Sequence, residues 1–287
     1  MIAKKYSKVS KIGQGKFGEV FRGTYQKTGA PVAIKIEKSD SPIKMIKHEA
    51  TLLNYLYSKG CRSTPIVYWY GLFDSHPTMV MPFYEMSLSQ WIVLNQDTIT
   101  EKENGLKRGF MIQMIDILDT IHSNSIIHRD IKPDNFMLRD NNTSLVLIDF
   151  GLSTVYVDDN NTISKNQLSK TILGTPKYVS IHVHAGLEPG RRDDLISIGY
   201  IWLFLENGGY LPWENININT DTSLEHLYPE IHILHYKNRE RARLKSWTVL
   251  QKYSLSTMTR DYLEATYALE YTECPRYKKY KEIFVAK

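Results

Sequence analysis

Three glycines within six residues form the first pattern in the chain that suggests ligand chemistry. They occur in Gly13-Gln14-Gly15-Lys16-Phe17-Gly18, between two runs that favour β-strands. Glycine lets backbone N–H groups approach phosphate oxygens closely, and a hairpin with such a run is suited to covering a bound phosphate. An ordinary glycine turn accounts for the same residues equally well, so this pattern alone assigns no function.

One lysine then occurs on an otherwise apolar strand, Val32-Ala33-Ile34-Lys35. Burying an unpaired ammonium is costly, so we expect Lys35 to have an anionic partner. Glu49 is the natural candidate, because it lies between apolar positions of a predicted helix. The phosphates of a nucleotide are the second candidate. The alternative is a surface lysine that keeps its ammonium in water.

Two further motifs follow a long predicted helix. The first is His128-Arg129-Asp130-Ile131-Lys132-Pro133-Asp134-Asn135, and the second is Asp149-Phe150-Gly151. Each motif taken singly is also consistent with a turn or a core strand. With the glycine run, Lys35 and Glu49, however, they occur in the order typical of eukaryotic-type protein kinases, and the chain resembles that family.

The resemblance implies a role for each matching residue. Asp130 would accept or orient the proton of a substrate hydroxyl, and Lys132 would reach the phosphoryl group. Asn135 and Asp149 would hold Mg²⁺ at the phosphates of ATP, and Asn135 counts with Asp130 and Lys132 as catalytic. The implied nucleotide-binding residues are Ile12, Gly13, Gly15, Gly18, Val20, Ala33, Lys35, Glu49, Met81 and Tyr84.

The region after Asp149 narrows the resemblance. Where typical kinases have Ala-Pro-Glu, this chain has Gly174-Thr175-Pro176-Lys177-Tyr178-Val179-Ser180-Ile181-His182. The segment resembles the casein kinase 1 family, and the likeness extends from Tyr6 to Phe284. Vaccinia-related kinases share much of the pattern, but the intact His-Arg-Asp and Asp-Phe-Gly favour casein kinase 1. Lys132 resembles serine/threonine kinases, so the implied reaction transfers the γ-phosphate of ATP to Ser or Thr.

The same resemblance implies protein substrates with an acidic or phosphorylated residue upstream of the acceptor. Lys170 and Lys177 fall where basic residues that bind such an anion belong, and two ammonium groups suit a phosphate. Solvated charges on a loop are the alternative. The stretch Glu214 to Ser246 departs from the family pattern. Its basic run, Lys237 to Lys245, is better explained as a solvated helix face than as a contact surface for acidic substrates or nucleic acid.

Two kinds of structure are needed to position these residues. From Tyr6 to Met81, short β-branched and aromatic runs separated by turns predict a small antiparallel sheet. One helix, with Ser41 as N-cap and Pro42 at its first position, interrupts this sheet. After Leu88 the apolar spacing becomes helical, and it predicts a long helix that ends near Ser123 and further helices over Leu195 to Leu205 and Thr257 to Leu269.

The expected fold class is therefore α+β. We expect one bilobal kinase domain over residues 1–287, in which an antiparallel-sheet N-lobe with one helix covers about residues 1–81. A hinge would cover about residues 82–87, and a larger, mainly helical C-lobe about residues 88–287.

Composition agrees with an ordinary globular protein. The 287 residues are 42% hydrophobic and 23% charged, which excludes a wholly disordered or fibrous chain. A net charge of +5 permits an acidic partner without demanding nucleic acid. The chain has only two cysteines and a charged start, and no apolar run approaches the roughly 20 residues that a membrane span needs. These features predict an intracellular location, in the cytoplasm or nucleus, with no membrane role.

Two other function classes remain open. A pseudokinase would bind nucleotide or partners without turnover, although the presence of Lys35, Glu49, Asp130, Asn135 and Asp149 argues against it. A nucleic-acid-binding protein would use the basic run, and its binding would weaken steeply with salt.

Overall fold

The computed structural model describes residues 1–285 except 15–17, 39–44, 96–100, 159, 161, 164–166, 170, 215 and 217–228. The chain divides into two compact units. Unit 1 consists of Met1–Leu88 together with Asp134–Ser153, and unit 2 of Ser89–Pro133 together with Thr154–Lys287.

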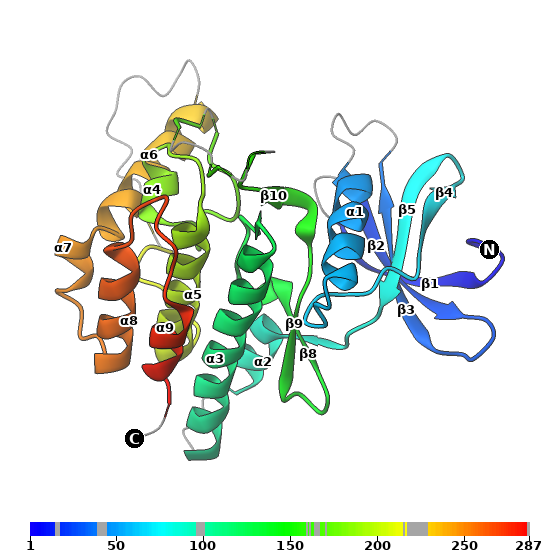
Figure 1. The fold of residues 1–287 in the computed structure, drawn as a ribbon, viewed down its shortest axis with the longest axis horizontal. Helices are drawn as coiled ribbons and strands as arrows, with labels where there is room; N and C mark the ends of the chain where they lie inside the picture. The colour runs from blue at the N-terminus through cyan, green and yellow to red at the C-terminus, as the bar shows by residue number, and fades with distance from the viewer. Residues whose placement is uncertain are drawn as a thin grey trace. The chain divides into compact units, whose positions relative to one another are not determined.

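Unit 1 is built on a five-stranded sheet in the order β1-β2-β3-β5-β4, in which all neighbours are antiparallel (Figure 1). Its strands are β1 Tyr6–Gln14, β2 Gly18–Tyr25, β3 Pro31–Glu37, β4 Trp69–Phe73 and β5 His76–Pro82. The central strand β3 has three consecutive buried residues, Val32, Ala33 and Ile34, as expected where both faces are covered. The predicted antiparallel sheet is confirmed.

Helix α1, Met45–Ser58, packs on this sheet with its apolar side. The buried positions include Ile46, Leu53 and Leu56, and Glu49 is buried among them. The predicted helix is confirmed over these residues, whereas its predicted start at Ser41 and Pro42 lies outside the described residues.

A second, three-stranded sheet also belongs to unit 1, with the order β6-β8-β9. Its strands are β6 Met86–Ser87, β8 Phe136–Arg139 and β9 Ser144–Leu147. The 3-10 helix η1, Pro133–Asn135, precedes β8, and η2, Phe150–Leu152, follows β9. These short elements set the positions of Asn135 and Asp149.

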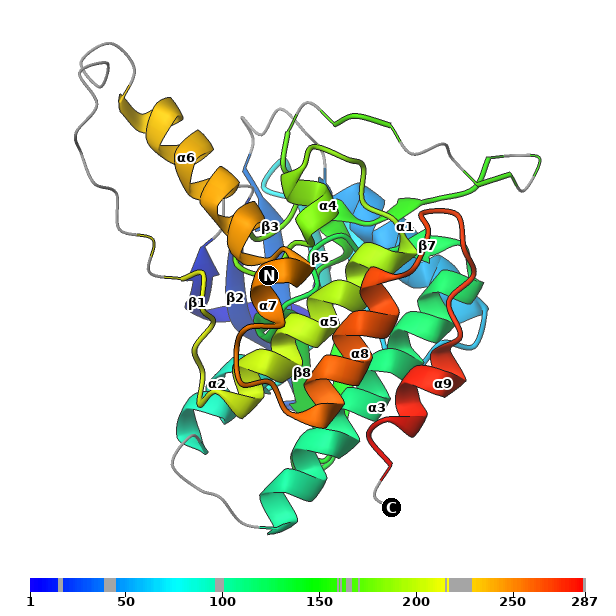
Figure 2. The same ribbon diagram turned by 90° about the vertical axis from the view of Figure 1, so that its left-hand side faces the viewer.

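Unit 2 is mainly helical (Figure 2). Its strand pair is β7 Ile126–Ile127 with β10 Thr154–Val155. Its helices are α2 Leu88–Leu94, α3 Glu101–Ser123, α4 Ile181–His184, α5 Arg191–Glu206, α6 Pro229–Leu244, α7 Trp247–Leu250, α8 Thr257–Tyr267 and α9 Tyr277–Glu282.

The predicted helices of unit 2 are confirmed, and their burial explains why the sequence forms them. One stripe of α3 is completely buried, and it contains Phe110, Met111, Met114, Ile115, Leu118 and Ile121. Helix α5 is buried along nearly its whole length and packs against α3 and α8. The expected α+β class, with an antiparallel sheet toward the N-terminus and a helical C-terminal part, is thereby confirmed. Within the described residues, no helix has the length and apolarity that a membrane span requires.

The sequence-based lobe boundaries stay a prediction. Asp134–Ser153, which that division placed with the C-terminal lobe, packs in unit 1 because β8 pairs with both β6 and β9.

Candidate active site

Gly13 and Gly18, the described glycines of the run, lie on β1 and β2, which pair antiparallel with Gly13 opposite Val20. A Cβ added to Gly18 would lie 2.3 Å from the carbonyl oxygen of Ile36, so the close approach of β3 requires that glycine. At Gly13 a Cβ would meet only Val20 at ordinary contact distance, so packing does not require it. Ile12 is 49% exposed, and Gly15 lies outside the described residues.

Lys35 forms the centre of an ion-pair cluster in unit 1. Its ammonium lies 2.6 Å from Glu49 Oε2 and 2.6 Å from Asp149 Oδ1. Burial by itself lowers the pKa of Lys35, but the charges of Glu49 and Asp149 outweigh it and hold that pKa above its ordinary value. Lys35 therefore has the carboxylate partner that its strand position predicted, and it has a second one as well.

Glu49 also contacts the backbone beside Asp149. Its Oε1 accepts a hydrogen bond of 3.2 Å from the N–H of Phe150. Burial raises the pKa of Glu49, and the ammonium of Lys35 opposes this. One buried side chain on α1 thus contacts both a strand residue and η2, which fixes the three elements to one another.

Asp149 is oriented and yet reachable from solvent. It is in the left-handed backbone region, with φ of 66°, and its side chain is 44% exposed. The N–H of Ile148, the residue before it, donates to the carbonyl of Asn135 over 2.8 Å. Asn135 itself is 4% exposed. Unit 1 therefore brings the two expected metal-binding residues to neighbouring backbone positions.

Those two side chains offer the oxygen donors that Mg²⁺ prefers. Proteins commonly bind Mg²⁺ through one or two carboxylates together with substrate phosphates, and less often in a cage made of protein ligands alone. In the described part of the chain no three His, Cys, Asp or Glu side chains form such a cage. A carboxylate at Asp149 and an amide oxygen at Asn135 therefore fit a metal that arrives with phosphate.

The expected hinge residues lie at the end of β5 and just beyond it. In the β3–β5 pairing Ala33 is opposite Met81, and both are buried. Tyr84 follows two residues after the strand ends at Pro82. Burial raises the pKa of Tyr84 to about 12, partly opposed by the charge of Arg139.

A second cluster, in unit 2, is centred on Asp130. Its Oδ2 accepts from the ammonium of Lys132 at 2.7 Å, and its Oδ1 accepts from the hydroxyl of Thr175 at 2.7 Å. Lys132 also donates to Thr175 Oγ1 over 3.0 Å. Thr175 thus contacts both Lys132 and Asp130. The carboxylate is held by two donors from different segments.

The backbone before Asp130 is braced by Asp194 at the start of α5. This buried carboxylate accepts from the N–H of His128 at 2.8 Å and from that of Arg129 at 3.0 Å. Burial raises the pKa of Asp194, but the hydrogen bond from His122 and the neighbouring donors outweigh it and leave that pKa below its ordinary value. Asp194 therefore braces the backbone of His128 and Arg129, and His122 helps to hold that carboxylate in place.

The two lysines expected to bind a substrate anion have different outcomes. Lys170 lies outside the described residues. Lys177 forms an ion pair with Glu214, and its ammonium lies 4.0 Å from the centre of the Phe204 ring. Sequence reasoning missed Glu214, because only tertiary structure brings it to Lys177.

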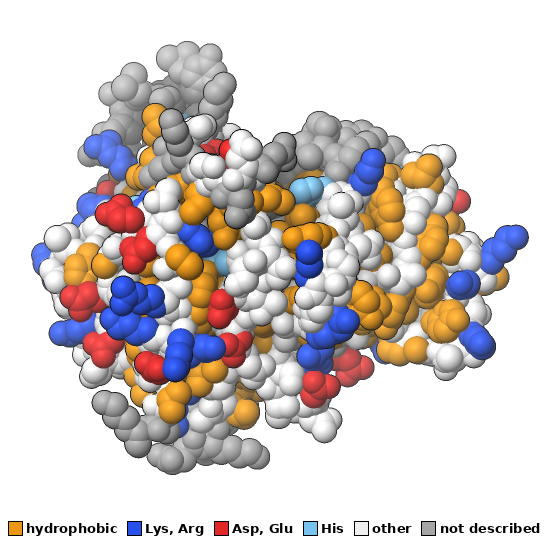
Figure 3. Space-filling model, viewed as in Figure 1, with side chains coloured by type: hydrophobic (Ala, Val, Ile, Leu, Met, Phe, Trp, Pro, Cys, Tyr) orange, Lys and Arg blue, Asp and Glu red, His pale blue; other side chains and the backbone are white. Residues whose placement is uncertain are grey.

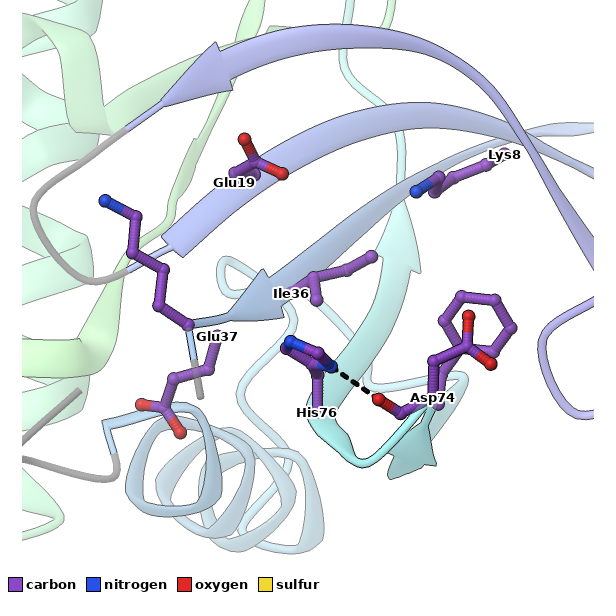
Figure 4. Close-up of a pocket in the computed structure, with 8 residues that line it drawn as sticks. Lys8, Glu19, Ile36, Glu37, Asp74 and His76 are labelled. Carbon is purple, nitrogen blue, oxygen red and sulfur yellow. Dashed lines mark hydrogen bonds between the residues drawn. The ribbon is translucent and has the colours of Figure 1, made fainter. Parts of the chain in front are cut away.

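A pocket of about 420 Å³ lies elsewhere in unit 1 (Figure 4). Its described lining is mostly charged and comes from β1, β2, the end of β3 and the β4–β5 hairpin: Lys8, Glu19, Ile36, Glu37, Lys38, Phe73, Asp74 and His76. The ring of His76 is tied to the carbonyl of Asp74 over 2.6 Å. None of the residues expected to bind nucleotide is in that lining.

Comparison with known families gives one finding. The family model described as Protein kinase domain matches residues 6–266 of the chain. The match covers nearly the whole chain, and it contains both the Lys35 cluster of unit 1 and the Asp130 cluster of unit 2.

Proposed function

The chain belongs to the protein kinase family, and from this we propose that it is an active serine/threonine kinase of the casein kinase 1 type. It transfers the γ-phosphoryl group of ATP to Ser or Thr hydroxyls of protein substrates, with Mg²⁺. The observation that supports turnover most directly is Asp149, whose carboxylate is fixed by Lys35 and remains 44% exposed. A carboxylate that is both oriented and accessible suits a metal delivered with nucleotide.

Phosphoryl transfer depends mainly on positioning and on stabilising charge. In the proposal Lys35 binds phosphate oxygens, while Glu49 keeps its ammonium in place. Asp130 orients the substrate hydroxyl and accepts its proton, and Lys132 places positive charge near the transferred group. Asn135 and Asp149 would hold Mg²⁺, which when bound neutralises charge on the phosphates.

Transfer of radiolabelled phosphate from ATP to casein tests this function, with Asp149→Asn as the control variant. We expect incorporation into Ser or Thr by the wild-type chain, and a loss of at least about 10²-fold in the variant. The alternative is a pseudokinase, which would bind nucleotide with no transfer above that of Asp149→Asn.

The casein kinase 1 assignment rests on the resemblance of residues 174–182 to that family. Acidic or already phosphorylated substrates follow from it, with Lys177 and Lys170 as the residues that contact the anion. Lys177 is engaged by Glu214, so a substrate anion has to compete with that carboxylate. An ammonium already paired with a carboxylate is in a setting that also suits phosphate.

Peptide pairs with and without a phosphoserine upstream of the acceptor test the substrate preference. We expect Lys177→Ala, alone and with Lys170→Ala, to weaken use of the phosphorylated peptide selectively. Glu214→Gln should have the opposite effect, because it removes the competing charge. Unchanged ratios between the two peptides in all three variants would reject the anion site.

Nucleic acid is not among the proposed partners. On the face drawn in Figure 3, basic side chains alternate with acidic ones over the described part of unit 2. Nucleic-acid binding is favoured by a continuous basic surface, which this face does not have among the described residues. The cytoplasm or nucleus stays a prediction for the location.

A further inference from the structure

Lys245, the residue after helix α6, is the most completely buried cation among the described residues, with 0% exposure. It belongs to the basic run whose sequence favours a solvated helix face, and for this residue that interpretation is wrong. The ammonium donates to the carbonyl oxygens of Pro176 at 3.0 Å and Val179 at 2.7 Å. Within the described residues it forms no ion pair with a carboxylate.

The surroundings of Lys245 are aromatic and basic. Its ammonium lies 4.9 Å from the ring centre of Tyr200 and 5.1 Å from that of Trp213, which favours a cation. His184 Nε2 lies 3.1 Å from the ammonium. Burial and then the charge of Arg241 lower the pKa of Lys245 well below its ordinary value. A buried ammonium without a carboxylate is costly, so its contacts with the loop require an explanation beyond packing.

Four consecutive carbonyl oxygens of that loop accept hydrogen bonds from side chains. Lys245 donates to the first and the last of these oxygens, those of Pro176 and Val179. Trp213 Nε1 donates to the carbonyl of Lys177 over 2.7 Å, and Ser197 Oγ donates to that of Tyr178 over 2.8 Å. Irregular backbone usually leaves such groups to water, whereas here buried donors fix every one of them.

The fixed loop begins directly after Thr175. The carbonyl of Thr175 accepts from the N–H groups of Tyr178 and Val179, at 2.8 and 3.0 Å, so it is part of the same turn. The hydroxyl of Thr175 in turn donates to Asp130. Within unit 2, Lys245 is therefore connected to Asp130 through the hydrogen-bonded turn from Thr175 to Val179 and the hydroxyl of Thr175. Helices α4 and α6, which lie side by side in Figure 2, flank this connection.

We propose that Lys245 is a positioning residue for phosphoryl transfer: it holds both ends of the Pro176–Val179 loop and thereby fixes Thr175 against Asp130. It contacts neither substrate nor nucleotide. The proposal rests on the proposed kinase function, and it adds a residue that acts through Thr175. A purely structural Lys245 would change the melting temperature and leave the turnover of the folded enzyme unchanged.

A double-mutant cycle separates these two roles. Lys245→Met removes the donors at similar volume, and Thr175→Val removes the hydroxyl at the other end of the connection. We expect Lys245→Met to lower kcat about 10- to 100-fold, with the KM for ATP unchanged. The kcat of the double variant should fall by no more than that of the more impaired single variant, because both substitutions act on the same contact between Thr175 and Asp130. Arg243→Met, which removes a 60% exposed cation two residues earlier, is the matched control and should keep wild-type kcat.

Hydrogen exchange of the amides from Lys177 to Val179 gives a readout that does not need turnover. We expect faster exchange in Lys245→Met than in the wild-type chain and the Arg243→Met control. If Lys245→Met does not fold, Lys245→Gln takes its place in the cycle and in the exchange experiment, with the same criteria.

The positioning role is rejected if the folded Lys245 variant keeps wild-type kcat, or if the losses of the two single variants simply multiply in the double variant. Unchanged amide exchange would also reject it. A wild-type chain without phosphate transfer would instead overturn the proposed function. Faster loop exchange in the variant would then show only that Lys245 orders the loop, and the role in transfer would fall with the function.

Discussion

Asp130 and Asp149, the two carboxylates of the proposed reaction, are each held by side-chain donors. Asp130 is fixed by Lys132 and Thr175, and Asp149 is fixed by Lys35. Each aspartate thus has at least one charged donor within 2.7 Å. Charge-assisted hydrogen bonds are stronger than neutral ones, so both carboxylates are oriented before any ligand arrives.

Replacement of Lys35 is the first residue-scale test. Lys35→Met should lower kcat by at least about 10²-fold, because it removes the cation proposed to bind phosphate. It also leaves buried Glu49 unpaired, so the melting temperature should fall. Steady-state kinetics and thermal unfolding measure the two effects. Lys27→Met, at an exposed turn, is the control, and a Lys35 variant with wild-type kcat would contradict the proposed role.

His184 provides a test of pH dependence. Burial, followed by the charge of Lys245, lowers its pKa to about 3, whereas an unfolded histidine titrates near its ordinary value of about 6.5. Between these values the unfolded chain binds the extra proton, so stability falls as the pH decreases through this range, by up to about 1.4 kcal/mol per pH unit.

His184→Asn should therefore flatten the dependence of unfolding free energy on pH between about 4 and 6.5. Urea unfolding at several pH values measures this slope. His235→Asn, at an exposed position, is the control for the effect of a histidine-to-asparagine replacement as such. An equal slope in wild type and His184→Asn would show that other groups cause the acid sensitivity.

Two helical glycines, Gly199 and Gly105, differ in how closely neighbouring elements approach them. On α5 a Cβ at Gly199 would lie 2.5 Å from Leu263 Cδ2 of α8, so the two helices approach through this position. On α3 a Cβ at Gly105 would meet nothing within 4 Å. The same residue type therefore serves close packing in one helix and only weakens the other.

Alanine at these two glycines should change stability in opposite directions. Gly199→Ala should destabilise by about 1–3 kcal/mol, because the methyl group overpacks the contact between α5 and α8. Gly105→Ala should stabilise by about 0.5–1 kcal/mol, because the helix loses a flexible residue. Denaturant unfolding of both variants measures the two signs, and equal shifts would contradict the packing argument.

The sequence predicted elements well where one face has a regular apolar spacing. Helix α8 was expected over Thr257 to Leu269 and is formed over Thr257–Tyr267, and the strands around Lys35 were located correctly. It did not predict the burial of Lys245 or the pairing of Lys177 with Glu214. Both depend on segments far away in the chain, and a lysine in a basic run has the same local pattern whether it is solvated or buried.

At the site, too, the sequence predicted the residues that lie within a recognisable motif and missed those that do not. Motif order indicated Lys35, Glu49 and Asp149, because these residues lie in recognisable local contexts. His122, which donates to Asp194, had no such context, since a histidine near the end of a helix has many uses.

At the scale of the whole molecule, nucleotide should stabilise the folded chain. A ligand that binds only the folded state at 100 times its Kd adds about 2.7 kcal/mol. We therefore expect Mg²⁺ and ATP together to raise the melting temperature, and chelation of Mg²⁺ to remove much of the rise. Differential scanning fluorimetry measures this. In Asp149→Asn the Mg²⁺-dependent part of the rise in melting temperature should be absent. An equal rise in that variant would contradict the proposed metal site.

Unit 1 consists of two separate stretches of chain, because Ser89–Pro133, which lies between Leu88 and Asp134–Ser153, belongs to unit 2. Cleavage of any single peptide bond therefore cannot release unit 1 intact. A fragment that stops at Leu88 keeps Lys35 and Glu49 but lacks Asp149, whereas the complementary fragment has Asp149 alone. Split-protein reporters cut at this point would regain the full charge cluster only on reassociation, which makes the chain suited to detecting proximity between two fused partners.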